Sequence, residues 1–599
     1  MKPQGGDDAI MVTMDYVIRK TLFISSPEQW DFQYDLIHAG NGTWRFKFQV
    51  SPRQETPTDW EIGFHLPGPG VQYLWYPNAG RDLRLRNVWE EDIPTMTSVG
   101  APVFCLLDCN GENRLTITAS ETKKPLFWCI GEEEESAGFV VRVRYPADCF
   151  AKGNVWKSEW MLDERNMSLP RILRTVQLYW EEECGKSPME TPPEAFESVY
   201  STWYSYHQYV TAEAVENECR LASTMGMKTV ILDDGWQTGN ETRGYEYCGD
   251  WEVYKPKFPD MKAHVQRVHD MGMKYMVWFS VPFVGKYSKV FPRFKNKLLH
   301  FQEDRGAGVL DPRYPDVREY LVSIYKDRMQ AYGWDGLKLD FIDEFHMWDD
   351  TPAFLPGMDC ACVQEGVEKL MIAVREAVLS VCSHAMIEFR QRYIGPDMRR
   401  FGNMFRVTDC PMDLLCNRTG MVNLRMLSGD TAVHSDMLQW HPSVSTEEAA
   451  RQIWNVLFGV VQISVRLADM SPEQEKMMRF LLRFRRENRD ILLHERLHVQ
   501  DPSALYPVVW AMGPGRVIAL CSESRTAACL PAEKSLCLVN TSGRPQTLLQ
   551  LQDSGRYHVT FYTCQGDRCG ETTVTLKAGD VVSLPVPVCG LAEMQFDRE

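Results

Sequence analysis

The stretch KTVILDDGW at residues 228–236 is the part of the sequence from which the fold is best deduced. Four apolar or β-branched residues run into two aspartates and a glycine, which is the pattern of a short buried strand followed by a tight turn. Similar runs return downstream as KYMVWFSVPF (274–283), GLKLDFID (336–343) and AMIEFR (385–390). We therefore expect a series of buried strands with polar or aromatic residues at their carboxyl ends.

Eight strand-like runs occupy residues 197 to about 480. The other four are SVYSTWYSY (198–206), MFRVTD (404–409), SDMLQW (435–440) and VVQISV (460–465). Amphipathic stretches lie between them, for example at 212–226, 316–333 and 364–382. Eight β-then-α units in about 280 residues fit a closed parallel (β/α)8 TIM barrel. An open doubly wound sheet is the alternative, but no glycine-rich phosphate loop follows any of these strands.

The sequence on both sides of this region alternates between apolar and polar residues. WRFKFQV (44–50) and FVVRVRY (139–145) are typical of antiparallel strands, and the proline-rich KSPMETPPEAF (186–196) closes the first region. Short strand-like runs at hairpin spacing return after about residue 485. We predict a multidomain α/β plus β protein: an N-terminal β-sandwich at 1–190, the catalytic barrel at 191–484 and a small C-terminal antiparallel β-sandwich at 485–599.

Composition excludes several classes of partner. The net charge of −16 argues against nucleic acid, because no surplus of basic residues exists to neutralise phosphates. No apolar run reaches the ~18 residues that span a bilayer, and the first twenty residues lack a secretory signal, so we expect a cytoplasmic protein with no membrane partner. Cys360 and Cys362 have no second pair nearby, and we therefore expect neither a metal nor a cofactor.

Acidic and aromatic residues gather where the predicted strands end, which in a barrel enzyme is where the loops converge on the active site. Such a lining suits a neutral, hydroxyl-rich ligand, because carboxylates accept hydrogen bonds from hydroxyls and tryptophan covers the face of a sugar ring. These strand-end residues are Asp233, Asp234, Trp278, Asp340, Glu388, Arg390, Asp409, Asp436, Trp440 and His441.

Two carboxylates, one ionised and one holding a proton, are the minimum equipment for cleaving a glycosidic bond. Asp340 follows Lys338 by two residues, so both side chains lie on one side of a strand and the ammonium favours the ionised carboxylate. Asp409 lies among apolar neighbours, which favours its protonated form. A strand-end acid is as often a helix cap, and Asp343 and Glu344 compete with Asp340 for its role.

The whole pattern resembles glycoside hydrolase family 36, in clan D, which contains α-galactosidases. The segments that carry the resemblance are LDDGW (232–236), GDWEVYKPKFPDM (249–261), GMKYMVWF (272–279), RGAGVLDPRYPDVREY (305–320) and GLKLDFID (336–343). They follow the family's order and approximate spacing across 197–480, about half of the chain. The resemblance also implies the β-domain, barrel, β-domain layout.

The resemblance implies a role for each matching residue. Asp340 is similar to the family's nucleophile and Asp409 to its general acid/base. Asp233 and Asp234 resemble the pair that accepts hydrogen bonds from the galactose 4- and 6-hydroxyls. The other residues that we expect at the substrate are Trp236, Trp278, Arg305, Lys338, Glu388, Arg390, Asp436, Trp440 and His441. His434, Asp436 and His441 could also suggest a metal site, but we favour substrate contacts.

The resemblance implies a retaining, exo-acting hydrolase that releases terminal α-linked galactose, or a similar sugar such as N-acetylgalactosamine, by double displacement. Its substrate partner is a carbohydrate, and by analogy with the family the chain is a candidate homo-oligomer. The chain departs from the family at Ile342, in EFRQRYIGPDMRR (388–400) and in TDCPMD (408–413). The alternatives are a transglycosylase of the raffinose-synthase type, a non-catalytic carbohydrate-binding protein on a decayed barrel, and a metal-dependent hydrolase.

Overall fold

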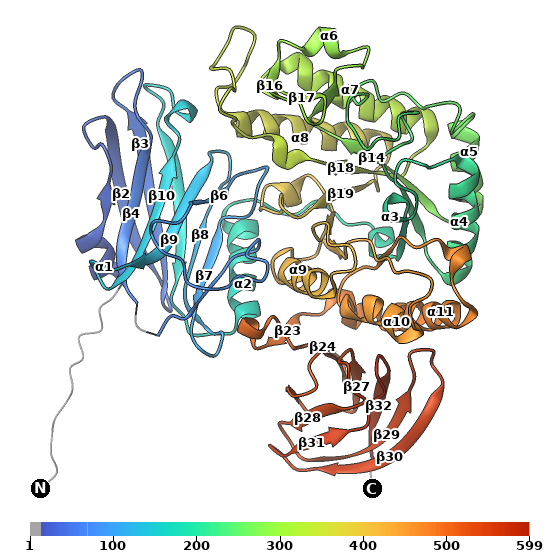
Figure 1. The fold of residues 1–599 in the computed structure, drawn as a ribbon. Helices are drawn as coiled ribbons and strands as arrows, with labels where there is room; N and C mark the ends of the chain where they lie inside the picture. The colour runs from blue at the N-terminus through green and yellow to red at the C-terminus, as the bar shows by residue number, and fades with distance from the viewer. Residues whose placement is uncertain (1–13, 69, 598–599) are drawn as a thin grey trace, which may run out of the picture. The chain divides into compact units, whose positions relative to one another are not determined.

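The computed structural model describes residues 14–68 and 70–597, which form two compact units (Figure 1). The first unit contains the N-terminal sheets. The second contains everything from Ser168 onward together with two short earlier segments, Pro77–Asp82 and Thr97–Ala101. Within the described ranges, no helix combines the length and apolarity that crossing a membrane requires.

The first unit is built from two antiparallel sheets. One has the strand order β1-β4-β10-β9-β6 and the other β2-β3-β11-β8-β7-β5. The elements are α1 (Met14–Thr21), β1 (Phe23–Ile24), β2 (Trp30–Gly40), β3 (Thr43–Pro52), β4 (Trp60–Pro67), β5 (Tyr73–Trp75), β6 (Ile93–Thr95), β7 (Val103–Leu107), β8 (Asn113–Ala119), β9 (Leu126–Glu133), β10 (Gly138–Tyr145) and β11 (Trp156–Asp163). Trp128 of one sheet packs on Trp160 of the other at 5.3 Å between ring centroids, so the two sheets share an aromatic core.

The second unit contains an eight-stranded parallel sheet that closes on itself. Its strands are β12 (Val199–Ser201), β13 (Thr229–Leu232), β14 (Lys274–Ser280), β18 (Gly336–Asp340), β19 (Met386–Arg390), β20 (Met404–Arg406), β21 (Ala432–His434) and β22 (Gln462–Ile463), paired in that order and back to β12. Hydrogen bonds from Val460 N to Val433 O (2.7 Å) and from Ser435 N to Val460 O (2.9 Å) complete the ring. The predicted (β/α)8 barrel is confirmed.

Helices follow most of the barrel strands, and α2 (Leu169–Leu178) precedes the first of them. The helices after β12 are α3 (Trp203–Tyr206), α4 (Ala212–Met225), α5 (Met261–Asp270), α6 (Phe291–Phe294), α7 (Pro315–Tyr332), α8 (Val363–Val381), α9 (Leu414–Leu427), α10 (Thr446–Asn455) and α11 (Pro472–Glu487). Local sequence explains their limits: Thr211 caps α4 by accepting from Ala214 N, and Gly226 ends it at φ 92°. Between β14 and α7 lies a small antiparallel sheet of β15 (Phe283–Gly285), β16 (Leu298–Gln302) and β17 (Ala307–Leu310).

The barrel interior changes from apolar to polar along the strands. Near their amino ends, Val199, Ile231, Met276, Met386 and Met404 form one buried cluster. Two residues further along each strand the side chains are polar or aromatic: Ser201, Asp233, Trp278, Lys338, Glu388 and Arg406. Because alternate residues of a strand point to the same side, a hydrophobic floor supports a polar chamber at the carboxyl ends.

One strand prediction was wrong. The seventh strand was expected at 435–440, whereas β21 covers Ala432–His434 and only Leu438 of the expected run forms a bridge, with Ile463. The backbone leaves regular pairing at Ser435 because Asp436 turns into the interior, where its main-chain N–H binds Asn417 Oδ1. Asp436 is thus part of the loop that follows the strand.

The C-terminal part is β-rich, as predicted, with one sheet of order β23-β24-β25-β27-β32-β29-β30 and another of order β26-β28-β31. Its strands are β23 (Leu497–Gln500), β24 (Val508–Gly513), β25 (Arg516–Cys521), β26 (Ala527–Leu530), β27 (Ser535–Asn540), β28 (Thr547–Leu551), β29 (Gly555–Tyr562), β30 (Arg568–Leu576), β31 (Val581–Leu584) and β32 (Leu591–Phe596). Most pairs are antiparallel, but β25 and β27 are parallel, as are β26 and β28. In each case the strand that lies between the two partners in sequence belongs to the other sheet, so the chain turns twice and returns in its original direction.

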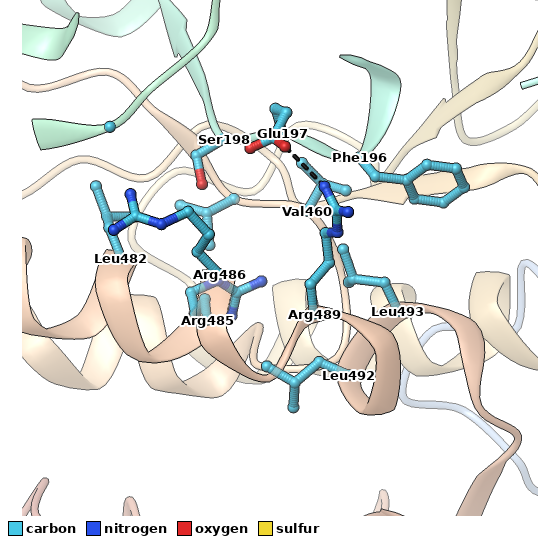
Figure 2. Close-up of a pocket in the computed structure, with 12 residues that line it drawn as sticks. Phe196, Glu197, Ser198, Val460, Leu482, Arg485, Arg486, Arg489, Leu492 and Leu493 are labelled. Atoms are coloured by element: carbon cyan, nitrogen blue, oxygen red, sulfur yellow. Dashed lines mark hydrogen bonds and ion pairs between the residues drawn. The ribbon is translucent and has the colours of Figure 1, made fainter. Parts of the chain in front are cut away.

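A small arginine-lined pocket lies near the amino ends of β12 and β22. Figure 2 shows Arg486 and Arg489 projecting from α11 and the turn after it toward Glu197 and Ser198, with Arg489 paired to Glu197 at 2.8 Å. Arg485 is buried and donates to the carbonyl groups of Val456, Leu457 and Gly459. These carbonyls lie just beyond α10, so Arg485 satisfies backbone groups that the helix leaves unpaired.

We expect the substitution Arg485→Met to destabilise the barrel by about 3 kcal/mol, because three carbonyl oxygens would lose their donor in a buried place. Differential scanning calorimetry would measure the loss as a lower unfolding midpoint. Arg483→Met is the matched control, since Arg483 lies on the same helix with its side chain 58% exposed. A control shift as large as that of Arg485→Met would refute the explanation.

Candidate active site

Asp340 ends β18 inside the polar chamber and is held by several donors. Its Oδ1 accepts from Arg390 Nε at 2.5 Å, from the Phe341 main-chain N–H at 2.8 Å and from the Tyr393 hydroxyl at 3.3 Å. Its Oδ2 accepts from Trp278 Nε1 at 3.1 Å. The carboxyl group is therefore fixed in one orientation by four donors.

The two oxygens of Asp340 differ in their availability. Oδ1 takes three hydrogen bonds, one of them from a cation, whereas among the described residues Oδ2 takes one hydrogen bond from a neutral indole. An oxygen with fewer donors keeps more of its lone-pair density for attack on carbon. Oδ2 is the oxygen that this geometry favours as a nucleophile.

Asp340 is held in its ionised form. Burial opposes ionisation, but the charges of Arg390, Lys338 and Arg406 outweigh it and hold the pKa of Asp340 well below its usual range. Arg390 is itself largely buried, with 13% of its side chain exposed; burial lowers its pKa, but the charge of Asp340 outweighs this and raises it above the usual range. A permanently charged carboxylate suits a nucleophile and does not suit a general acid.

Asp233 and Asp234, after β13, lie in the same chamber. Lys338 Nζ donates to Asp233 Oδ2 at 2.5 Å, so the ammonium that was expected beside Asp340 bonds to Asp233 and reaches Asp340 only through its charge. Asp234 accepts from the side-chain amides of Gln208 and Gln237, both at 2.7 Å. Burial raises the pKa of Asp234 to about 6.

The environment of Asp409 differs from the one that the sequence predicted. The predicted apolar enclosure is absent: 56% of the side chain is exposed, and its Oδ1 lies 2.9 Å from Arg406 Nη1. Arg406 is buried and also pairs with Asp436, which accepts from Tyr204 Oη at 3.0 Å. Burial raises the pKa of Asp436 to about 6, against the opposing charge of Arg406. Asp409 is thus an accessible carboxylate that pairs with a buried network formed by Arg406 and Asp436.

A cavity of about 280 Å³ opens beside this network at the ends of β12, β21 and β22. Trp440, which was predicted to contact the ligand, lines it together with Tyr204. Polar side chains complete the wall: Gln439, Arg466, Asp469 and Gln474. Because Tyr204 Oη donates to Asp436, the cavity lies on the Asp409 side of the chamber.

Four predicted ligand contacts lie in other environments. Trp236 is fully buried, donates to Trp278 O and packs against Trp251 and Trp334, so it supports the chamber wall from behind. Glu388 lies in the same layer as Lys338, but it is buried and its carboxylate binds Gln462 and Arg406.

Arg305 and His441 bond to partners other than the carboxylates described above. Arg305 pairs with Glu344 at 2.9 Å and lies over the ring of Phe283, and His441 is exposed and bonds to Ser443. His434 donates from Nε2 to Ala195 O inside the barrel, so it does not converge with Asp436 and His441 on a shared point.

Sequence reasoning missed three residues that hold the site together. Arg406 carries a signal that could have been used, since it is the one charged residue in the inward positions of an otherwise apolar strand, MFR. Tyr204 and Tyr393 carry none, because a tyrosine outside the strands predicts no particular partner. Only the tertiary structure reveals their bonds to Asp436 and Asp340.

Two short segments from the N-terminal part of the chain complete the rim. Gln391 Nε2 donates to Pro77 O at 2.9 Å, and Gly100 N donates to Arg392 O. Arg81 pairs with Asp413, which caps α9 four residues after Asp409. The loops that follow β19 and β20 are therefore braced by Pro77 and Arg81, which precede their partners in the chain by 314 and 332 positions.

Part of this chain is similar in sequence to known proteins. The Melibiase family model matches residues 197–354, which include β12, β13, β14 and the Asp340 strand. The α-galactosidase Mel36A of Lactobacillus acidophilus is 29% identical over 134 residues, which are 21% of this chain and 17% of that protein. The chain is similar to α-galactosidases of family 36. The aligned segment nevertheless spans less than a fifth of the relative's length.

Solved family 36 structures share the whole architecture. The Geobacillus stearothermophilus α-galactosidase AgaA, in complex with raffinose, aligns at a TM-score of 0.67 with 12% identity, covering 95% of this chain and 81% of that one. The Lactobacillus brevis α-galactosidase aligns at 0.66 with 13% identity, covering 96% and 86%. The order of β-rich part, barrel and β-rich part is therefore the fold of family 36.

Proposed function

We propose that this protein is a retaining, exo-acting glycoside hydrolase that releases terminal α-linked galactose. The observation that supports it most is Asp340: a buried, ionised carboxylate at a barrel strand end with one oxygen left available for attack. Relatives that match part of the chain bear the name α-galactosidase, and AgaA is solved with raffinose.

In the first step Asp340 Oδ2 forms a bond to the anomeric carbon as the bond to the leaving oxygen breaks, and Asp409 gives that oxygen a proton. In the second step Asp409 takes a proton from water, whose oxygen displaces Asp340 from the anomeric carbon. Two inversions return the α configuration. The exposure of Asp409 lets it reach both a leaving group and a water molecule.

For the sugar, we propose a galacto-configured ring with a hydroxyl at carbon 2. Asp233 and Asp234 supply the acceptors that an axial 4-hydroxyl and a 6-hydroxyl require. Arg390 ends β19, directly before the loop that the family places near carbon 2, and lies beside Asp340. A guanidinium donor suits a hydroxyl oxygen, whereas the methyl group of an N-acetyl substituent needs an apolar contact.

A panel of 4-nitrophenyl glycosides tests the substrate. We expect kcat/KM for the α-galactoside to exceed that for the α-N-acetylgalactosaminide and the α-glucoside by about 10²-fold or more, because a mismatched hydroxyl leaves buried acceptors unpaired. Equal kcat/KM values for the α-galactoside and the α-N-acetylgalactosaminide would refute the proposal that the sugar carries a hydroxyl at carbon 2. No turnover of any glycoside would favour the non-catalytic alternative.

Hydrolysis competes with transfer to a sugar. The cavity of about 280 Å³ lined by Tyr204 and Trp440 would hold the group attached to the galactose, and an acceptor sugar could enter it instead of water. Product analysis with a galactosyl donor and sucrose would separate a hydrolase from a transglycosylase. We also propose domain limits at 1–190, 191–484 and 485–599, a carbohydrate as the substrate, no nucleic acid or membrane partner, and the homo-oligomer as a candidate assembly.

A further inference from the structure

Arg390 bridges two carboxylates, of which the mechanism above uses one. Its Nε binds Asp340 Oδ1 at 2.5 Å and its Nη2 binds Asp343 Oδ1 at 3.2 Å. The three side chains are similarly enclosed, with 12–13% of each exposed. A buried cation with two carboxylate partners keeps one of them if the other loses its charge.

The backbone is shaped to bring Asp343 to this position. Phe341, directly after Asp340, adopts the left-handed conformation with φ 64°, which is unfavourable for a bulky residue. A short 3-10 turn, Ile342–Glu344, follows and returns the chain toward β19. Arg390 then lies over the Phe341 ring at 5.3 Å with Asp343 at its far side.

The charge balance around Arg390 changes during the proposed reaction. In the free enzyme Asp340 and Asp343 both face one guanidinium, an excess of one negative charge. In the glycosyl-enzyme Asp340 is an ester and carries no charge, and Arg390 then faces Asp343 alone among the described carboxylates. An unpaired buried cation is strongly destabilising, so Asp343 is needed most in the intermediate.

We propose that Asp343 is a positioning residue that acts through Arg390, taking over as counter-ion of the guanidinium while Asp340 is esterified and so stabilising the covalent intermediate. The inference rests on the retaining mechanism proposed above. Because Asp343 already shares the Arg390 guanidinium in the free enzyme, Asp340 can lose its charge on esterification without leaving Arg390 unpaired.

The titration of Asp343 agrees with this sequence of events. Burial raises the pKa of Asp343, and the nearby charge of Asp340 raises it further against the pull of Arg390. Esterification of Asp340 removes that repulsion, and the Asp343–Arg390 pair becomes a simple one-to-one pair. The charged or titratable groups around it are Asp340, Glu344, Arg390, Arg392 and Tyr393.

The test measures the two half-reactions separately with 5-fluoro-α-galactosyl fluoride. Asp340 Oδ2 bonds to the anomeric carbon as fluoride leaves, and water later displaces Asp340 with loss of a proton. Intact-protein mass spectrometry follows the gain and the loss of the adduct. In Asp343→Asn we expect adduct formation to slow about tenfold or more and adduct loss to accelerate several-fold, because only the intermediate loses its counter-ion.

Opposite changes in the two rates distinguish this role from a structural one, which would slow both. Asp350→Asn is the matched control, since Asp350 lies in the same β18–α8 connection with its side chain 62% exposed and bonded to His300. Asp343→Glu should restore both rates. If Asp343→Asn does not fold, Asp343→Glu against Asp343→Gln makes the same comparison at constant length.

Two results would overturn the inference in different ways. Unchanged rates, or an equal loss in both, with a normal adduct on Asp340 would refute the role of Asp343 and leave the proposed function intact. Absence of any adduct on Asp340 in the unaltered enzyme would refute the retaining mechanism and this inference with it.

Discussion

Replacing Asp340 with glycine is expected to lower kcat/KM for aryl α-galactosides by about 10⁴-fold or more, since no other carboxylate among the described residues occupies its place beside Trp278 and Arg390. Asp343, its nearest competitor in sequence, is bonded to the far side of Arg390. Steady-state assays with 4-nitrophenyl α-galactoside would measure the loss.

Adding sodium azide tests whether the lost activity is due to the missing nucleophile. The glycine variant leaves a space beside a cationic guanidinium, where a small anion can approach the anomeric carbon directly. We expect azide to restore part of the rate and to give the β-galactosyl azide, which proton NMR identifies by its anomeric coupling. Near-normal turnover without azide would show that Asp340 is not the nucleophile, and Asp350→Asn should keep the parent rate.

Replacing Asp409 with alanine is expected to give a loss that depends on the leaving group. For an alkyl or sugar leaving group, kcat/KM should fall by about 10³-fold, because the departing oxygen needs a proton. For a 2,4-dinitrophenyl leaving group, which departs as a stable anion, kcat/KM should fall by less than about tenfold. Its kcat should still drop, since water is no longer deprotonated in the second step.

The control for this variant is Asp413→Asn, four residues further along the same loop. Asp413 caps α9 and pairs with Arg81, so its loss displaces the loop without removing a proton donor. Its effect should be the same for all leaving groups. A loss in Asp409→Ala that is equally independent of the leaving group would assign Asp409 a structural role.

The barrel and its strand-end acids could be predicted because they depend on local sequence. A buried parallel strand requires a short apolar run, and its alternation determines that Asp233 and Asp340 point into the interior. The seventh strand was misplaced because SDMLQW reads as a strand, whereas Asp436 turns inward to bind Asn417 and Arg406, which are distant in sequence.

The sequence by itself therefore determined the fold class, the position of Asp340 at the end of a barrel strand and the family resemblance of its neighbours. Only the tertiary structure decided the partners: that Lys338 bonds to Asp233, that Arg390 bridges Asp340 and Asp343, and that Asp409 is exposed beside Arg406. The two kinds of feature differ in how far apart in the sequence the interacting residues lie. Strand formation and alternation depend on adjacent residues, whereas the charge on a carboxylate depends on cations that the closed barrel brings from other strands.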